Sequence, residues 1–187
     1  MRNPPPTLGL VGTASGGLGS IRARLVEPLI ADGWRVAITL TPTAGTWLRA
    51  SGELAKLEQL TGFPVRVQPR LPGEARPHPP ADGYAVVPAS ANTVAKLALG
   101  IADNQALATV GEALGTPGVP VVIFPRVNAA QARHPAWQSH TDALRRAGAE
   151  LIYGDDVWPL REPRSAPGRD LPWQIILDRI KAVIGSS

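Results

Sequence analysis

The stretch Tyr84-Ala85-Val86-Val87-Pro88-Ala89-Ser90-Ala91-Asn92-Thr93 decides the fold that the sequence predicts. Its apolar first half predicts a buried β-strand that breaks at proline, and a helix-like segment follows Thr93. In an open parallel sheet, ligands bind outside the carboxyl ends of the strands, where helix N-termini favour polar and anionic groups. The candidate ligand-binding residues at this tip are therefore Ala89, Ser90, Asn92 and Thr93. The same pattern equally suits a plain helix N-cap, with Ser90 or Asn92 closing the first turn.

The alternation of strand, loop and helix recurs on both sides of this stretch. Short apolar runs predict further strands at residues 7–12, 35–40, 62–67, 121–124 and 149–153. We therefore predict one α/β domain over residues 1–187, a doubly wound, Rossmann-like (flavodoxin-like) parallel sheet of about six strands. Two long loops, 68–82 and 154–172, interrupt the pattern. Pro28 lies inside the first helical pattern and should kink or weaken it.

Two other predicted strand tips carry small hydroxyl residues. Strand 7–12 runs into Thr13-Ala14-Ser15-Gly16-Gly17, a turn whose backbone N–H groups suit a phosphate. Strand 35–40 ends at Thr41-Pro42-Thr43, whose hydroxyls should face the same edge, although Thr43 would also suit a plain N-cap. The first turn lacks the G-x-G-x-x-G spacing of dinucleotide sites, and no acidic residue ends the second strand. A mononucleotide such as FMN therefore fits this edge better than NAD.

Composition argues against several other kinds of site. The chain has no cysteine, which excludes disulfides and catalytic thiols, and its three histidines lack the close spacing of a metal site. The net charge is +4, and the basic residues are 16 arginines and 3 lysines without a charge block, so we expect no nucleic-acid surface. Some arginines would suit an anionic cofactor or substrate. We see neither a membrane-spanning run nor a signal peptide, and we expect a cytoplasmic protein.

The strand-tip residues form ordered motifs. Pro88 to Thr93, followed by Gly100-Ile101-Ala102-Asp103-Asn104, resembles the PASANT and G-I-x-D-N motifs of the homo-oligomeric flavin-containing cysteine decarboxylases. This family includes the peptidyl-cysteine and phosphopantothenoylcysteine decarboxylases. The first turn, 13–21, is similar to the family's T-A-S-x-x-x-x-S-I opening. The resemblance covers nearly the whole chain and implies FMN, bound by the strand-tip residues at a subunit interface of a trimer.

The resemblance also implies catalytic residues. Pro125-Arg126-Val127-Asn128 is similar to the start of the family's substrate motif P-x-M-N-x-x-M-W, so Asn128 would hold the substrate carboxylate. The motif's methionines and tryptophan are replaced, which implies a different or wider pocket. The family's catalytic histidine lies fourteen positions before the proline of PASANT, where this chain has Glu74, and His78 follows four residues later. Either His78 acts as the base, or Glu74 substitutes, or the decarboxylase chemistry has been lost. The 154–172 loop matches a substrate clasp, or is an ordinary surface loop.

The leading hypothesis is an FMN-dependent oxidative decarboxylase of a cysteine-type thiol carboxylate, at a peptide C-terminus or in a small molecule. The first alternative is an FMN-binding protein that has lost this activity. The second is a flavin prenyltransferase-like enzyme, suggested by residues 12–16 and by Pro125-Arg126.

Overall fold

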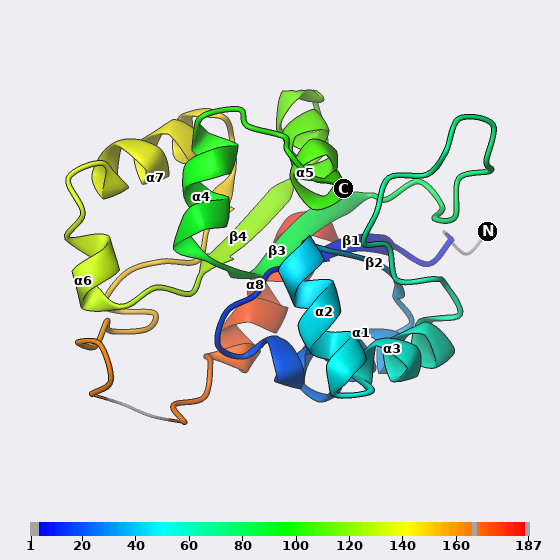
Figure 1. Ribbon diagram of the computed structural model, residues 1–187, viewed down its shortest axis with the longest axis horizontal. Helices are drawn as coiled ribbons and strands as arrows, with labels where there is room; N and C mark the ends of the chain where they lie inside the picture. The colour runs from blue at the N-terminus through cyan, green and yellow to red at the C-terminus, as the bar shows by residue number, and fades with distance from the viewer. Residues whose placement is uncertain (1–3, 166–167, 186–187) are drawn as a thin grey trace.

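The computed structural model describes residues 4–165 and 168–185, and these build a five-stranded sheet in which every strand pair is parallel. The strands are β1 (Thr7–Gly12), β2 (Arg35–Leu40), β3 (Gly83–Ala89), β4 (Val121–Pro125) and β5 (Glu150–Leu151). Their order is β2-β1-β3-β4-β5, so the chain moves from β1 to one edge and then crosses to the other (Figure 1). This doubly wound arrangement confirms the predicted fold class.

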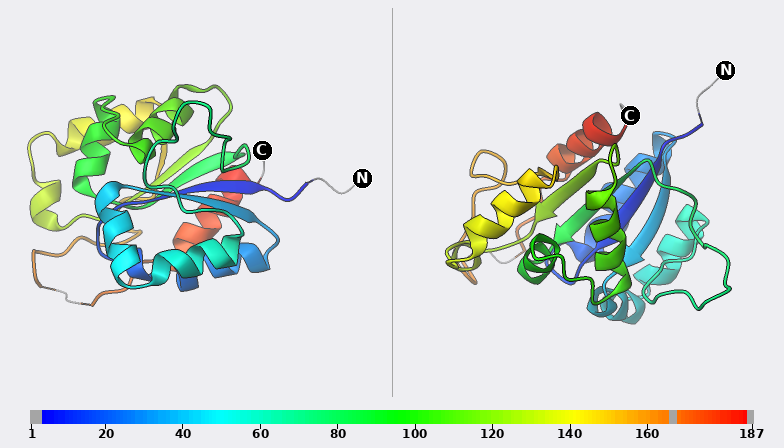
Figure 2. Two further views of the ribbon diagram at one scale, coloured as in Figure 1. Left: turned by 45° about the vertical axis from the view of Figure 1, so that its right-hand side comes forward. Right: turned by 90° about the horizontal axis from the view of Figure 1, so that it is seen from above.

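Helices cover the two faces of the sheet as separate layers (Figure 2). The elements on one face are η1 (Leu18–Ser20), η2 (Arg22–Val26), α1 (Glu27–Ala31), α2 (Pro42–Ala50), α3 (Glu53–Thr61) and α8 (Trp173–Ile184). Those on the other face are α4 (Ala91–Ala98), α5 (Gln105–Gly115) and α7 (Trp137–Arg146). The short helix α6 (Ala129–Ala132) follows the carboxyl end of β4. Among the described helices, none has the length and hydropathy to cross a membrane.

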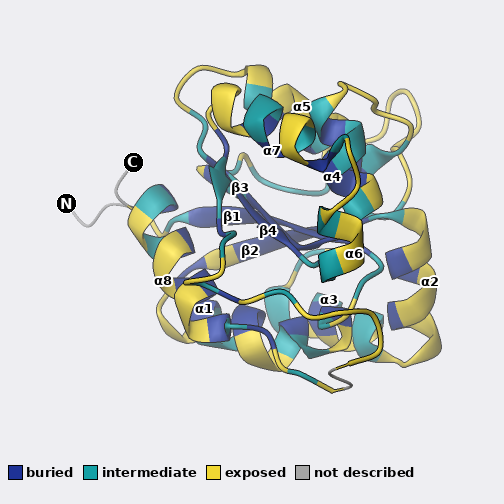
Figure 3. Ribbon diagram, turned by 90° about the vertical axis from the view of Figure 1, so that its left-hand side faces the viewer, coloured by how far each residue is buried: buried dark blue, intermediate teal, exposed yellow. Residues whose placement is uncertain are grey.

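The strands are buried on both faces, which explains their continuous apolar runs (Figure 3). Because successive side chains point to opposite faces, Leu10 and Ile38 pack in the cluster with α1, α2 and α8. Val11, Val86 and Ile123 pack in the second cluster, with α4, α5 and α7. The order of the strands reverses between β1 and β3, and their carboxyl ends therefore border the crevice in which such folds bind ligands.

The described residues form five strands, where the sequence predicted about six. In the segment 62–67, only Arg66 pairs with the sheet, through an isolated parallel bridge to Thr39. Pro64 cannot donate to a ladder, and prolines begin again at Pro69, so the segment is too short to continue as a strand. The last predicted strand, 149–153, is reduced to the two residues of β5.

Pro28 has the predicted effect on the first helical pattern. The turn before it, η2, is a π-helix, and regular α-helix begins only at Glu27. Proline has no N–H to donate to the carbonyl four residues earlier, which explains why the α-helical ladder does not run through this segment. Parts of two predictions lie outside the described residues: residues 1–3, used in the signal-peptide argument, and residues 166–167 of the 154–172 loop.

Candidate functional site at the carboxyl edge of the sheet

Thr13 joins the carboxyl ends of β1 and β3. Its hydroxyl donates to the Pro88 carbonyl at 2.8 Å and accepts from the Ser90 N–H at 2.8 Å, and its side chain is buried. The Thr13 N–H adds a longer bond to the Pro88 carbonyl, at 3.3 Å. The hydroxyl thus donates one hydrogen bond and accepts one within the protein, which fixes the shape of this edge. It has no further donor for a ligand.

Ser90 is the N-cap of α4, which confirms the capping interpretation of the central motif. Its hydroxyl oxygen accepts from the Thr93 N–H at 3.2 Å and lies 3.0 Å from the Thr93 hydroxyl. Asn92 lies within the first turn, is exposed, and makes no side-chain hydrogen bond to the described residues. The Ala89 carbonyl accepts the Arg126 N–H at 2.7 Å, which ties the tips of β3 and β4 together.

The tip of β2 differs from its prediction. The N-cap of α2 is Thr41 and not Thr43, which lies one residue after Pro42 in the first turn. Neither threonine hydroxyl bonds to the described residues, so both remain available at the carboxyl edge.

Two buried polar atoms at this edge have no hydrogen-bond partner among the described residues: Ser15 Oγ and Arg126 Nε. Arg126 lies beside the turn that carries Ser15, since a Cβ added to the next residue, Gly16, would stand 3.2 Å from Arg126 Nη2. A buried group without a partner costs about 1–3 kcal/mol, and such groups in native proteins point to an unseen ligand or water. The glycine-rich turn and Arg126 therefore fit a polar or anionic ligand.

A small cavity of about 130 Å³ lies between the tip of β4 and the 154–172 loop. Arg126, Asn128, Trp158 and Arg169 border it. Burial, and to a lesser extent the charge of Arg169, lowers the pKa of Arg126 from its ordinary value. Asn128 caps α6 by accepting from the Gln131 N–H at 2.9 Å, while its Nδ2 donates to none of the described residues. Its amide N–H₂ is thus available to an acceptor in the cavity.

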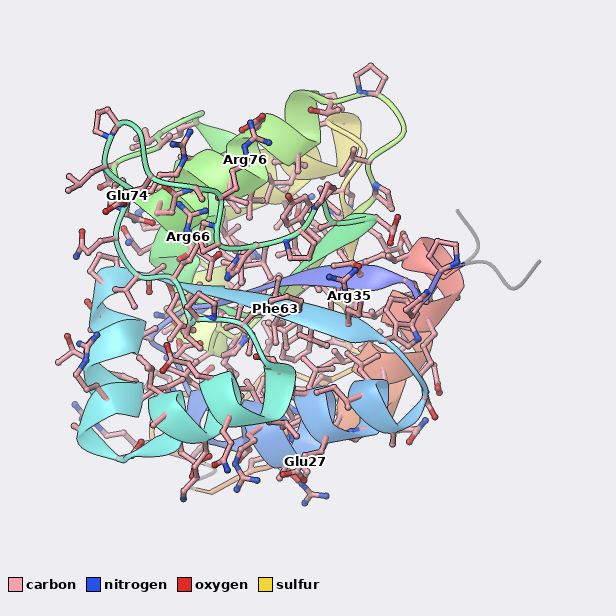
Figure 4. All side chains as sticks on the ribbon, turned by 90° about the vertical axis from the view of Figure 1, so that its right-hand side faces the viewer. Glu27, Arg35, Phe63, Arg66, Glu74 and Arg76 are labelled. Carbon is pink, nitrogen blue, oxygen red and sulfur yellow. The ribbon has the colours of Figure 1, made fainter. Side chains whose placement is uncertain are left out.

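The 68–82 loop does not bring His78 to this edge of its own chain. His78 Nε2 donates to the Pro64 carbonyl at 2.7 Å, and its ring meets the Phe63 ring edge-on at 6.4 Å. The Phe63 ring lies 5.3 Å from the guanidinium carbon of Arg35, the first residue of β2, and so at the amino end of the sheet (Figure 4). Six strand residues, about 17–20 Å, separate this region from Thr41. Burial lowers the pKa of His78 below its ordinary value.

Glu74 lies in the exposed part of the same loop (Figure 4). Its carboxylate accepts the Leu71 N–H at 2.7 Å and so closes a turn within the loop. Beneath the loop is a second crevice of about 750 Å³, on the face of β1 and β2 beside α5. It is larger than the cavity at the carboxyl edge, but the strand-tip residues do not line it, and the buried atoms without partners are not there.

The predicted site set lacked Arg126, Trp158 and Arg169, which surround the cavity at the carboxyl edge. The sequence signals for them were the excess of arginine over lysine and, for Arg126, the Pro125-Arg126 pair. No periodicity relates residues that lie on two separate loops.

Comparisons with known proteins show the family of this chain. A model of the family described as Flavoprotein matches residues 3–185. A cysteine/cysteine sulfinic acid decarboxylase from an unknown prokaryotic organism is 38% identical over 72 residues, which are 38% of this chain and 19% of that protein. The coenzyme A biosynthesis bifunctional protein CoaBC of Mycobacterium bovis is 34% identical over 143 residues, 74% of this chain and 32% of that protein. The chain thus spans about a fifth to a third of the length of these curated relatives.

Solved structures show the same fold. MrsD from a Bacillus species superimposes with a TM-score of 0.68 at 21% identity, over 94% of both chains. The FMN-dependent cysteine decarboxylase TvaF, from thioviridamide biosynthesis, gives a TM-score of 0.62 at 25% identity, over 78% of this chain and 88% of that one.

Proposed function

Because the chain belongs to the Flavoprotein family, that of the homo-oligomeric flavin-containing cysteine decarboxylases, we propose that it binds FMN at the carboxyl edge of its sheet. We further propose that it uses FMN in the oxidative decarboxylation of a cysteine-type thiol carboxylate, in a small molecule or at a peptide C-terminus. When bound, FMN supplies a two-electron acceptor. The observation that carries this proposal is the buried Ser15 hydroxyl without a partner, in the glycine-rich turn after β1.

The strand-tip residues divide into two groups in this proposal. Thr13, Ser90 and Thr93 bond to one another and to the backbone and fix the shape of the edge, with Ala89. The groups left to contact FMN are the side chains of Ser15, Thr41, Thr43 and Asn92 and the backbone at Gly16. A tight glycine-rich turn suits the phosphate, because backbone N–H groups that are not engaged within such a turn can bind phosphate oxygens.

Asn128 is the proposed ligand of the substrate carboxylate. Its Oδ1 is engaged in the cap of α6, which fixes the amide at the border of the cavity and leaves the Nδ2 donors for a ligand. A neutral amide orients a carboxylate without the strong ground-state stabilisation of an ion pair. That matters for a group that leaves as neutral CO₂, because only interactions that strengthen in the transition state accelerate a reaction.

As the catalytic base we propose His78 or Glu74, and His78 lies near the amino end of β2 in its own chain. In a trimer, which the family resemblance implies, the 68–82 loop would act at the flavin of a neighbouring subunit. The position of this loop also favours a second candidate function, an FMN-binding protein without decarboxylase activity.

Flavin binding is tested by the Ser15→Ala variant. We expect purified protein to be yellow, and Ser15→Ala to bind FMN roughly 10-fold more weakly, the loss of one hydrogen bond of about 1–1.5 kcal/mol. The apo variant should be at least as stable as wild type, because the change removes a buried hydroxyl that has no partner. Colourless wild-type protein that does not take up added FMN would refute the proposal.

Decarboxylation is tested by anaerobic addition of a peptide that ends in cysteine. We expect the flavin absorbance to bleach, and mass spectrometry to show a product that lacks CO₂ and two hydrogens. A matched peptide ending in serine is the control and should leave the flavin oxidised. Protein that binds FMN but bleaches with no thiol carboxylate would support the second candidate, a non-catalytic flavoprotein.

A further inference from the structure

The crevice of about 750 Å³ beneath the 68–82 loop has a flat apolar floor. In the register of the sheet, Ala37, Gly9 and Tyr84 lie side by side across β2, β1 and β3. Gly9 has no side chain, and the Tyr84 ring occupies the space above it, since a Cβ added to Gly9 would stand 2.4 Å from two ring atoms. The proline-rich loop and α5 line the rest of the crevice. Its volume is within the range of about 300–1,000 Å³ that is typical of small-molecule sites.

Arg66 and Thr39 add polar groups to this floor. They are partners in the isolated parallel bridge beside β2, and paired residues direct their side chains to the same face of a sheet. The Arg66 N–H donates to the Ile38 carbonyl at 2.9 Å, and the Arg66 carbonyl accepts the Leu40 N–H at 2.7 Å, which fixes this position. Thr39 is 4% exposed, and its hydroxyl forms no hydrogen bond with any described residue. A nearly buried hydroxyl that lines a cavity and has no partner points to a ligand in that cavity.

The crevice also carries an excess of positive charge. Arg66, Arg70 and Arg76 line it. Glu112 of α5 is the one acidic residue that does so in the described part of the chain. The guanidiniums of Arg66 and Arg76, which lie on the same side of the sheet (Figure 4), form neither a hydrogen bond nor an ion pair with the described residues. Burial, and then the charge of Arg70, lowers the pKa of Arg66, as expected for a cation that lacks a counterion.

These groups fit an aromatic acid better than other small ligands. Guanidiniums without partners bind a carboxylate, sulfonate or phosphate through directional hydrogen bonds. Burial, and then the charge of Glu112, raises the pKa of Tyr84, so its hydroxyl keeps its proton and remains a donor. The apolar floor and the prolines of the loop suit a flat ring. An inorganic anion would leave this apolar surface in water, and an uncharged ring would leave the guanidiniums without partners.

We propose that this crevice binds an aromatic acid, that is, a flat aromatic body that carries an anionic group. The anionic group contacts Arg66, Arg76 and the Thr39 hydroxyl. The aromatic body lies between the floor at Tyr84 and the 68–82 loop. The strand-tip residues proposed to bind FMN do not line this crevice, so the inference is independent of the proposed function.

The first experiment compares two probes that have the same rings. Anilinonaphthalene sulfonate carries an anionic group, and phenylnaphthylamine lacks it. Calorimetry with the full chain should show one molecule of the sulfonate bound per chain, and binding of the neutral probe that is weaker by about 10-fold or more. Arg66→Gln and Arg76→Gln should each weaken binding of the sulfonate about 10- to 100-fold, the range for losing a charged hydrogen bond. Arg49→Gln, the same change at an exposed arginine of α2, should have no effect.

Thr39→Val separates binding from stability. The variant should bind the sulfonate about 2- to 10-fold more weakly, the range for losing one neutral hydrogen bond. Its melting temperature should not fall, because the hydroxyl that it removes has no partner within the protein. A purely structural role for Thr39 would instead lower the melting temperature and leave binding of the sulfonate unchanged. Arg76 lies in an exposed part of the loop, so its variant keeps the test valid if Arg66→Gln is unstable.

The second experiment tests whether this site is separate from the flavin site. FMN-loaded and flavin-free protein should bind the sulfonate equally in calorimetry, and so should Ser15→Ala. If FMN displaces the sulfonate, the probe occupies the flavin site and the inference is wrong. It is also wrong if the neutral probe binds as tightly as the sulfonate, or if both arginine variants bind it like wild type.

Size-exclusion chromatography tests the other possible occupant, a second copy of this chain. If wild-type protein is an oligomer that Arg76→Gln dissociates, and the sulfonate binds only the dissociated chain, the crevice is a subunit interface and the inference is wrong. If the sulfonate binds every oligomeric state equally, the inference is supported. The two-probe comparison and the arginine variants need no flavin, whereas the proposed function fails if no flavin binds, so the two failures are distinguishable.

Discussion

Replacing Thr13 by valine should lower the free energy of unfolding more than the small change in side-chain volume suggests. Valine has nearly the same shape as threonine, so the change creates almost no cavity. It removes a 2.8 Å bond to the Pro88 carbonyl and leaves the Ser90 N–H without its acceptor. A net loss of about 1 kcal/mol for the first and about 1–3 kcal/mol for the second predicts a destabilisation of about 2–4 kcal/mol. For a chain of this length, about 3 kcal/mol lowers the melting temperature by about 6–12 °C.

Thr141→Val is the matched control for this prediction. Thr13 and Thr141 are each 1% exposed, but the Thr141 hydroxyl donates only to the Gln138 carbonyl in its own helix. Its removal should cost about 1 kcal/mol or less. Urea or thermal denaturation of both variants measures the difference. If Thr13→Val is as stable as Thr141→Val, the hydroxyl does not hold the tips of β1 and β3 together, and the account of this edge is wrong.

Three further changes test other parts of the structure. Asn128→Asp keeps the α6 cap but replaces the amide donor by a negative charge, so KM for a thiol carboxylate should rise about 10- to 100-fold with an unchanged melting temperature. Burial lowers the pKa of His78, so stability should fall as the pH drops below about 6.5, and His78→Gln should flatten that part of a plot of melting temperature against pH. Gly17→Ala should cost about 2–4 kcal/mol in denaturation experiments, because φ is +94° and a Cβ would overlap Leu171, whereas the unhindered Gly19→Ala should cost little.

Local features of the sequence were sufficient to predict the fold class and the central strand tip. The apolar run before Pro88 forms β3, and Ser90 caps α4, because burial on both faces and the choice of cap residue are properties of a few consecutive residues. The break in the first helical pattern at Pro28 was likewise predictable, because the missing N–H of proline acts within one turn of helix. The motif resemblance pointed to the family that the comparisons then showed.

Other features depend on segments that meet only in the folded chain. Thr13 bonds to a residue 77 positions away, and Arg126 meets Trp158 and Arg169 across a loop whose path no periodicity encodes. The bridge at Arg66 remained too short to count as a strand, because neighbouring prolines limit pairing with β2. His78 is close to the central motif in sequence but lies near the amino end of β2, because contacts with Phe63 and Pro64 fix the loop there.

The sequence by itself therefore determined which strand tips are polar. Only the tertiary structure decided which side chains are already bonded there and which are left for a ligand, since hydrogen bonding and burial depend on partners from distant parts of the chain.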